Sequence, residues 1–248
     1  MDARLAPFLS LLALMLLWSV AALLTQDPQV LPTPWGLVPR FAEEAASGEL
    51  VRHLSTTIFR VLWAFGLAMA FGVILGFVMG RHRGINRWLD PWLVVFLNLP
   101  ALVVIVLCYL WIGLTEAAAI IAVTLNKVPN VATVIREGAR ALDPKLDAMA
   151  HVYRMGTVAR LRHIILPQLA PFIAAAARSG VAIIWKIVLV VEFLGRSSGI
   201  GFQIHLYFQL FDVGMVLVYS LSFIAVMLLV EWVILQPWER KTNRWRTA

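Results

Sequence analysis

The strongest constraint on this chain is a series of long apolar segments, each long enough to cross a lipid bilayer. A spanning helix needs about 20 mostly apolar residues, and about six segments meet that requirement. By residue number they are 8–25, 56–80, 91–113, 117–135, 169–194 and 213–234. Backbone polar groups in lipid must be satisfied within the segment, and the period-two alternation of a membrane barrel is absent. The sequence therefore predicts an all-α integral membrane protein.

Composition supports this interpretation. Apolar residues make up 61% of the 248 residues and charged residues 14%, which is too apolar for a soluble domain of this length. The net charge of +7 does not indicate nucleic acid, because the basic residues stand between apolar segments and form no soluble basic face. Cys108 is the single cysteine and the five histidines have no metal-ligand spacing, so we predict neither an intrachain disulfide nor a metal site.

We divide the chain into residues 1–55 and residues 56–248. The first part holds one transmembrane helix and an external loop, and the second holds the core with about five transmembrane helices. The loop's prolines predict an extended stretch, followed by a short surface helix over residues 41–46. The first apolar segment has an alternative, a cleaved signal peptide, because Arg4 precedes it and Ser19-Val20-Ala21 resembles a cleavage site. Its length and Trp18 favour a retained helix.

Orientation follows from the basic residues, since short cytoplasmic loops keep Lys and Arg. One side holds most of them: Arg81, Arg83, Arg87, Arg136, Arg140, Lys145, Arg154, Arg160, Arg162, Arg240, Lys241, Arg244 and Arg246. The other side has Arg40, Arg52 and Arg196 in its loops. Both termini and the long central loop are therefore predicted to be cytoplasmic.

The second apolar segment has small residues at an unbroken four-residue spacing, namely Ala64, Ala68, Gly72, Gly76 and Gly80. Such a stripe lets another helix approach closely, so we predict a helix-packing seam. The alternative is chance, because glycine is common in membrane helices generally.

The most informative segment is the central loop, about residues 136–167. Asp143 is placed to cap a helix whose first residue is Pro144, and apolar residues recur at three- and four-residue spacing after it. A second short helix over residues 158–165 is expected after a break near Gly156, with Pro167 opening the next membrane helix. The residues alone leave two roles open: docking onto another protein, or lying on anionic membrane lipid.

Here the sequence resembles a known family. Asp147-Ala148-Met149-Ala150, the break at Gly156 and Ile164-Ile165-Leu166-Pro167 are similar to the coupling loop of binding-protein-dependent ABC importer permeases. The resemblance extends over most of the chain from Leu31 and points to the nitrate/sulfonate/taurine branch. Its further motifs are Leu31-Pro32-Thr33-Pro34, Gly80-Arg81-His82-Arg83, Leu89-Asp90-Pro91, Leu142-Asp143-Pro144, Arg178, Trp185, Glu192, Gly195, Ser198-Gly199 and Gly201.

Two positions depart from the family pattern. Counting back from Leu166-Pro167, the usual acidic residue falls on Ala148 and the usual glycine falls on Arg154. Either the helix break is shifted toward Gly156, or Arg154 makes a contact specific to this protein's partner.

The resemblance implies a type I ABC importer permease fold and a transport subunit in a bacterial inner membrane, without a catalytic site or bound cofactor of its own. The implied partners are a second permease subunit, expected as a homodimer, an ATPase subunit that binds ATP and Mg, and a periplasmic or lipid-anchored substrate-binding protein. The chain itself lacks the glycine-rich phosphate loop of an ATPase. The coupling residues carried over are Asp147, Ala148, Met149, Ala150, Tyr153, Arg154, Gly156, Leu166 and Pro167.

Polar residues inside the membrane segments are candidates for a translocation path, because they are costly there and often functional. They are Asn98, Pro100, Lys127, Arg178, Lys186 and Glu192. The cations suit a small anionic solute such as nitrate, a sulfonate or taurine, in keeping with the branch. The alternative is that they pair with Glu192, Glu231 or backbone carbonyls, or reach the interface. Pro100 either frees a carbonyl for the path or simply bends its helix.

Two rival functions come from other classes. An ion-coupled carrier or channel would work without ATP, but such carriers often show two similar halves, and no clear half repeat is visible. An intramembrane enzyme would need a nucleophile with its base, paired aspartates or a zinc motif, and none appears in the sequence.

Overall fold

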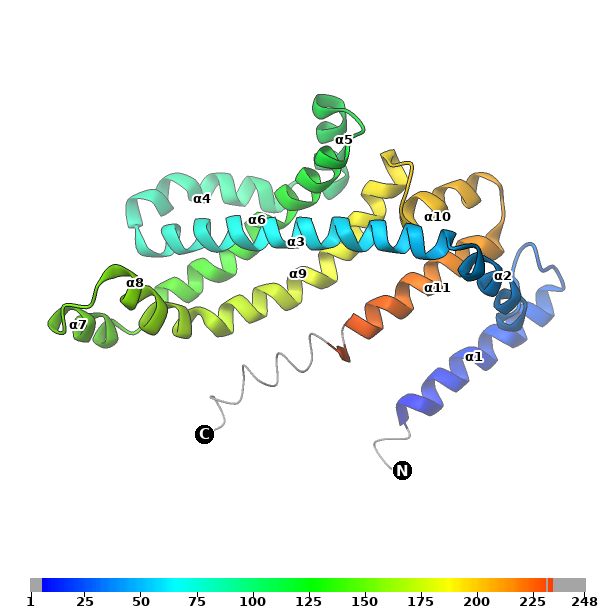
Figure 1. Ribbon diagram of the computed structural model, residues 1–248, viewed down its shortest axis with the longest axis horizontal. Helices are drawn as coiled ribbons and strands as arrows, with labels where there is room; N and C mark the ends of the chain where they lie inside the picture. Colours follow the sequence, from blue (N-terminus) through cyan, green and yellow to red (C-terminus); the bar gives the residue numbers. More distant parts are fainter. Residues whose placement is uncertain (1–5, 231, 234–248) are drawn as a thin grey trace. The chain divides into compact units, whose positions relative to one another are not determined.

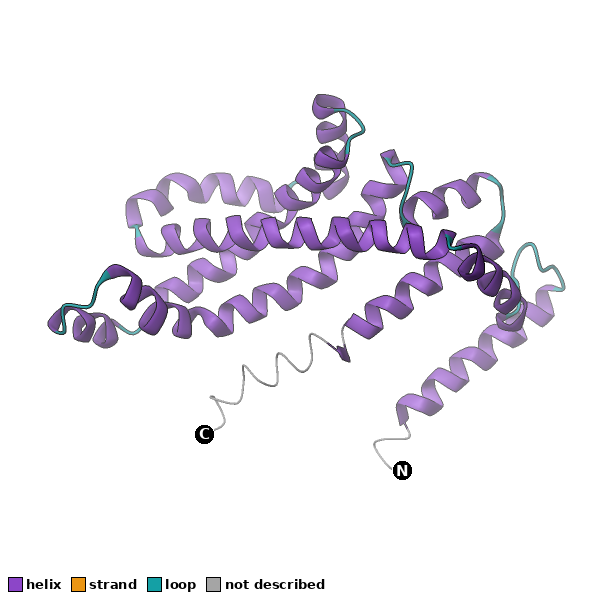
Figure 2. Cartoon of the chain, in the orientation of Figure 1, coloured by secondary structure: helices purple, strands orange, loops and turns teal. Residues whose placement is uncertain are grey.

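The computed structural model describes residues 6–230 and 232–233, and every regular element in those residues is a helix (Figures 1 and 2). The helices are α1 (Ala6–Thr25), α2 (Pro34–Ser47), α3 (Glu49–Arg81), α4 (Arg83–Asn98), α5 (Ala101–Ile112), α6 (Glu116–Arg140), α7 (Pro144–Val152), α8 (Thr157–Arg160), the π-helix η1 (Leu161–Ile165), α9 (Leu166–Gly195), α10 (Ile200–Gln209) and α11 (Val213–Val230). The predictions on Arg4, Glu231, Ile234, Arg240, Lys241, Arg244 and Arg246 lie outside the described residues.

Four helices are long and apolar enough to span a membrane. They are α3, α6, the continuous helix Thr157–Gly195 and α11. The α4–α5 pair would make a fifth span, and residues Leu9–Thr25 of α1 form a shorter apolar helix. Each predicted segment thus falls on one of these helices, although the third is broken and the first is short.

The chain forms two compact units. Among the described residues, one combines residues 6–57 with 192–228, and the other is formed chiefly by residues 58–191. In the first unit the Tyr219 hydroxyl of α11 donates to Glu44 Oε2 of α2 at 2.6 Å, and Arg40 pairs with Asp212 at 2.6 Å. These polar contacts tie α2 to the residues around α11.

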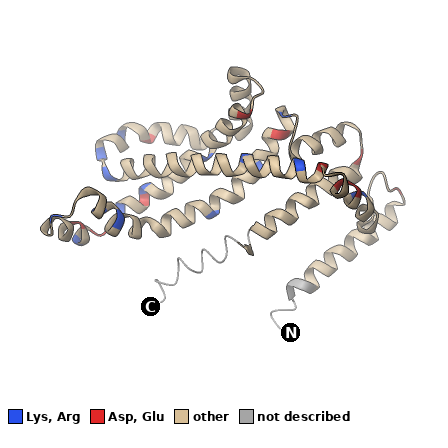
Figure 3. Ribbon diagram, viewed as in Figure 1, with Lys and Arg blue, Asp and Glu red and all other residues tan. Residues whose placement is uncertain are grey.

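In the second unit α3, α6 and α9 run side by side, and α4 returns along α3 (Figure 1). The core between α3, α4 and α6 contains Met79, Leu93 and Ala132. A second cluster joins Val131 and Ile135 of α6 to Ala176 of α9. Figure 3 shows Lys and Arg gathered where α3 meets α4 and around α7 and α8, at one end of this unit.

The small-residue stripe of α3 lies against α6. A methyl group built on Gly72 would come within 2.5 Å of the Val131 side chain, and one on Gly76 would fall on the Ala132 carbonyl oxygen. Gly80 meets Ala139 in the same way, and Ala64 and Ala68 are fully buried. The two backbones approach this closely because α3 presents no side chains between them.

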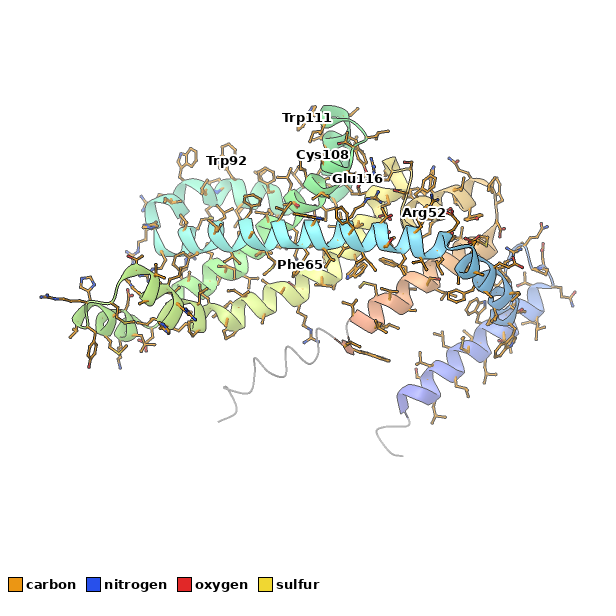
Figure 4. The ribbon with its side chains drawn as sticks, viewed as in Figure 1. Arg52, Phe65, Trp92, Cys108, Trp111 and Glu116 are labelled. Carbon is orange, nitrogen blue, oxygen red and sulfur yellow. The ribbon has the colours of Figure 1, made fainter. Side chains whose placement is uncertain are left out.

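The third predicted segment, residues 91–113, is not one straight span. It is the end of α4 and all of α5, which meet at Leu99-Pro100 with a bend of 98°. Proline disfavours the helical conformation at the residue before it, and Leu99 has an extended backbone with a ψ of 125°. Trp92 of α4 and Trp111 of α5 point away from the ribbon (Figure 4).

Two smaller predictions were also wrong. The external helix starts at Pro34, well before residue 41, because the Thr33 hydroxyl accepts from Gly36 N and proline is tolerated in the first turn. Residues 158–165 are not a separate short helix, since α8, η1 and α9 run on as one helix. In η1 the Leu166 N–H donates to the Leu161 carbonyl, and this wider turn carries the helix up to Pro167, which has no N–H to donate.

Candidate functional site: the α7–α8 loop and the charges of the membrane helices

The α7 helix begins as its sequence predicts. The Asp143 side chain accepts from Lys145 N at 2.8 Å, and Pro144 occupies the first turn. The Asp143 amide in turn donates to the side-chain oxygen of Gln168 in α9 at 2.9 Å. The start of α7 is therefore fixed to the beginning of α9.

Asp147 anchors the middle of α7. Its carboxylate accepts from Arg81 Nη2 at the end of α3, at 3.0 Å, and also pairs with Arg160 of α8. Burial raises the pKa of this carboxyl, but the hydrogen bonds from the two arginines outweigh burial and hold the pKa below its ordinary value. Because the pKa in the fold is lowered, the pairing is complete at neutral pH and is lost only as pH falls through that lowered value.

The opposite side of the loop is apolar and exposed. Val152 is 80% exposed, Tyr153 75% and Val158 78%, and Leu146 and Met149 are also exposed. Ala150 faces inward and is buried. Exposed apolar side chains that gather on one surface mark a contact site for another protein or a membrane.

Arg154 produces the break after α7. Its backbone is left-handed, with a φ of 50°, whereas Gly156 has an ordinary φ of −62° and caps α8. The left-handed region favours glycine because it has no Cβ. The break therefore stays at the position where the resemblance expects glycine, and an exposed arginine occupies it. Of the remaining predicted loop residues, Ala148, Leu166 and Pro167 are exposed.

The three membrane cations occupy different surroundings. Lys127 of α6 is 1% exposed and lies against Gly180 and Phe65, whereas Arg178 and Lys186 of α9 are exposed. The structure therefore does not bring the three cations together into one cluster. In the segment around the bend, Asn98 is exposed and its amide donates to the Val94 carbonyl at 2.8 Å.

Glu192 is fully buried at the end of α9 in the first unit. Its Oε2 accepts from the Thr57 hydroxyl and from Gly201 N, each at 2.9 Å. Gly199 N donates to His53 Nδ1 at 2.9 Å beside it, and a methyl group on Gly199 would fall on the carboxylate. The carboxylate thus caps the first turn of α10 and joins α3 to it.

Sequence reasoning missed the ion pairs of three arginines. Arg81 and Arg160 served as topology signals, and Arg81 also as part of a family motif, but their pairing with Asp147 was not predicted. Arg60 was not singled out at all, although it is 1% exposed and pairs with Glu116 through two hydrogen bonds of 2.8 and 2.6 Å. The sequence did offer a signal for the pair of Arg60 with Glu116, because Arg60 lies inside an apolar segment.

Among the described residues, no group of three His, Cys, Asp or Glu side chains is arranged to hold a metal ion.

Comparison with known proteins gives one family. A family model described as "Binding-protein-dependent transport system inner membrane component" matches residues 68–236. The putative aliphatic sulfonates transport permease protein SsuC of Bacillus subtilis is 32% identical over 219 residues, covering 88% of this chain and 79% of that protein. The taurine transport system permease protein TauC of Escherichia coli is 25% identical, covering 75% and 70%.

The fold also matches a solved transporter. The crystal structure of an amino acid ABC transporter with histidines aligns with a TM-score of 0.64, covering 81% of this chain and 97% of that chain. Its sequence identity is 20%, so this likeness shows the fold alone.

Proposed function

The chain belongs to the family of binding-protein-dependent transport system inner membrane components, as an ABC importer permease of the sulfonate/taurine branch, and we propose that a separate ATPase drives it through the α7–α8 loop. The solute that it moves inward is a small oxyanion. The single observation that carries the coupling role is the two-sided loop, which is anchored to α3 on one side and apolar and exposed on the other.

The exposed side supplies the docking surface. Val152 and Tyr153 lie outside the apolar helices and Val158 lies in the first turn of the helix Thr157–Gly195, and their exposure to water is unfavourable unless a partner covers them. The basic residues beside them, Lys145, Arg154 and Arg162, suit an acidic groove on the partner.

The anchored side transmits the movement. Arg81 and Arg160 hold Asp147, so a displacement of α7 reaches the end of α3 and the start of the continuous helix Thr157–Gly195. Two long helices that share one rigid connection move together when the ATPase subunits close. This arrangement converts ATP binding outside the membrane into helix movement inside it.

The solute class is inferred from the relatives and from charge. The relatives are named for aliphatic sulfonates and taurine, both of which carry a sulfonate group. Arg178 and Lys186 are exposed cations within a membrane helix, and they would lower the cost of an anion there. No step requires a cofactor on this chain, because ATP and Mg act on the ATPase.

The remaining partners complete the importer. A second permease copy faces this one across the path, and a periplasmic or lipid-anchored binding protein delivers the solute. The loop and both termini lie on the cytoplasmic side of the bacterial inner membrane, in keeping with the basic residues around α7 and α8.

Co-purification from native membranes tests the docking role. Tyr153→Asp places a charge in the exposed surface, and Ile85→Asp is the matched control, an exposed apolar residue of α4 near the same end of the unit. The ATPase subunit should be recovered with the parent and with Ile85→Asp, and lost with Tyr153→Asp. Equal recovery with both variants would show that this surface binds lipid or nothing at all.

A further inference from the structure

One side of α6 is polar along its second half. Asn126, Asn130, Thr133 and Glu137 recur at spacings of four, three and four residues, which places them within about 60° of arc on the helix. All four are at least partly exposed, although α6 is otherwise the most buried of the spanning helices. The second half of the helix therefore leaves a polar side open.

A similar surface runs along α9. Part of its exposed side is small, polar or cationic and covers about 100° of arc; the residues of this part are Ala175, Arg178, Ser179, Ala182 and Lys186. Ile183 and Val190 are exposed beside it. The other side of α9 is buried, with Ala176 in the cluster formed with α6 and Gly180 against Phe65.

The two open sides point the same way. Helices α6 and α9 pack on each other, since a methyl group on Gly138 would fall on the Phe172 ring. Both also pack on α3. Helix α6 contacts Gly72 and Gly76 of α3, and Gly180 of α9 lies close to Phe65 of α3. The open residues lie roughly opposite the α3-facing residues on each helix, so together they form one surface, here called the α6–α9 polar face.

Contact with lipid is unfavourable for this face. Amide and charged groups at membrane depth are costly in hydrocarbon and are found against protein or water. Lys127 adds to that cost, because it is buried behind the face, close to Gly180 on the buried side of α9, and has no hydrogen-bond or ion-pair partner among the described residues. A buried cation without a counter-ion attracts an anion.

We propose that the α6–α9 polar face is the wall of the solute path, with the Asn126 and Asn130 amides donating to the oxyanion of a sulfonate while Lys127, Arg178 and Lys186 supply positive charge. The proposal rests on the importer function and deepens it by naming the contact residues. Burial of the same side at Ala118, Ala119, Ala122 and Val123, in the first half of α6, closes the path toward one end of the helix. The solute therefore meets the amides before it can leave along Thr133 and Glu137.

Cysteine accessibility tests this assignment on the assembled importer. Cys108 is buried and is first changed to Ala, and Asn130→Cys is then compared with Ile74→Cys. Ile74 is an exposed apolar residue of α3 between Gly72 and Gly76, so it lies near the level of Val131, and we expect it to face lipid. A charged thiol reagent should modify Asn130→Cys at least about tenfold faster, since apolar surroundings suppress the reactive thiolate. An aliphatic sulfonate should slow that modification.

Three results would overturn the proposal. One is equal, slow modification at both positions. Another is a disulfide between Asn130→Cys in two permease copies without reagent modification, which would make the face a permease–permease contact. The third is fast modification that no sulfonate slows although the cysteine-free parent takes up that sulfonate. Failure of the proposed function would be seen separately, as the absence of ATP-driven sulfonate uptake by the parent importer. Cysteine modification is measured without any uptake, so the two failures can be told apart.

Discussion

The guanidinium of Arg81 donates to the carboxylate of Asp147 at 3.0 Å and joins the last residue of α3 to the middle of α7. The two residues are 66 positions apart in the sequence. Through this contact, a movement of the exposed loop is transmitted to a membrane helix, because α7 cannot shift without moving α3 or breaking the pair.

Removing this pair should uncouple transport without unfolding the protein. A partly exposed ion pair contributes about 0.2–1 kcal/mol, so Asp147→Asn should change stability little. Solute uptake per ATP hydrolysed should fall several-fold, as measured in proteoliposomes that contain the whole importer. Arg81→Gln should do the same, and the double variant should be no worse than either single variant. Additive losses would mean that the two residues act separately.

Arg154 should tolerate glycine better than a β-branched residue. The left-handed conformation costs a side chain about 1–2 kcal/mol, and Arg154→Gly removes that strain, partly offset by the freedom of glycine in the unfolded chain. Arg154→Val should lower the thermal midpoint of the purified permease, because β-branched residues are rare at positive φ. A valine variant as stable as the glycine variant would contradict the observed backbone. ATPase recovery with Arg154→Gly then reports the docking contribution of the arginine side chain itself.

The seam between α3 and α6 should be sensitive to a single methyl group. Gly76→Ala places its Cβ on the Ala132 carbonyl oxygen, and overpacking of this kind costs about 1–3 kcal/mol. Gly66→Ala, in the same helix, meets nothing within 4 Å and should leave the thermal midpoint unchanged or raise it. If both variants unfold at the same temperature, the helices do not pack as described.

Glu192 should be needed for its hydrogen bonds and not for its charge. Glu192→Gln keeps an oxygen that can accept from Gly201 N and Thr57, so folding and uptake should stay close to those of the parent. Glu192→Leu leaves a buried N–H unsatisfied, at a cost of about 1–3 kcal/mol. Yield and uptake of the two variants are compared in the same membranes. A Glu192→Gln variant that folds but does not transport would indicate that Glu192 takes part in the translocation path.

Local features of the sequence predicted much of this architecture. The cap at Asp143 and the helix that follows Pro144 depend on neighbouring residues only, and the structure has them as predicted. The break after α7 was harder to place, because glycine at position 156 suggested a shift, whereas the left-handed residue is Arg154. Side-chain type suggested the wrong position, because arginine has no preference for the left-handed region that it adopts here.

Features that depend on distant residues could not be predicted. Glu192 meets Thr57 across 135 positions, and Asp147 meets Arg81 across 66. Neither pairing leaves a periodic signal in the chain. The polar side of α6 does leave a periodic signal, since Asn126, Asn130, Thr133 and Glu137 follow the helical period. This signal was missed because the sequence analysis considered mainly the charged residues of the membrane segments.

Reconstitution into vesicles tests the central claim most directly. The purified chain is incorporated alone or together with its ATPase and binding protein, and entry of a radiolabelled aliphatic sulfonate is followed with ATP or with an ion gradient. The account predicts entry only when all the subunits and ATP are present. Entry through the chain alone, driven by the ion gradient, would contradict it and identify a carrier.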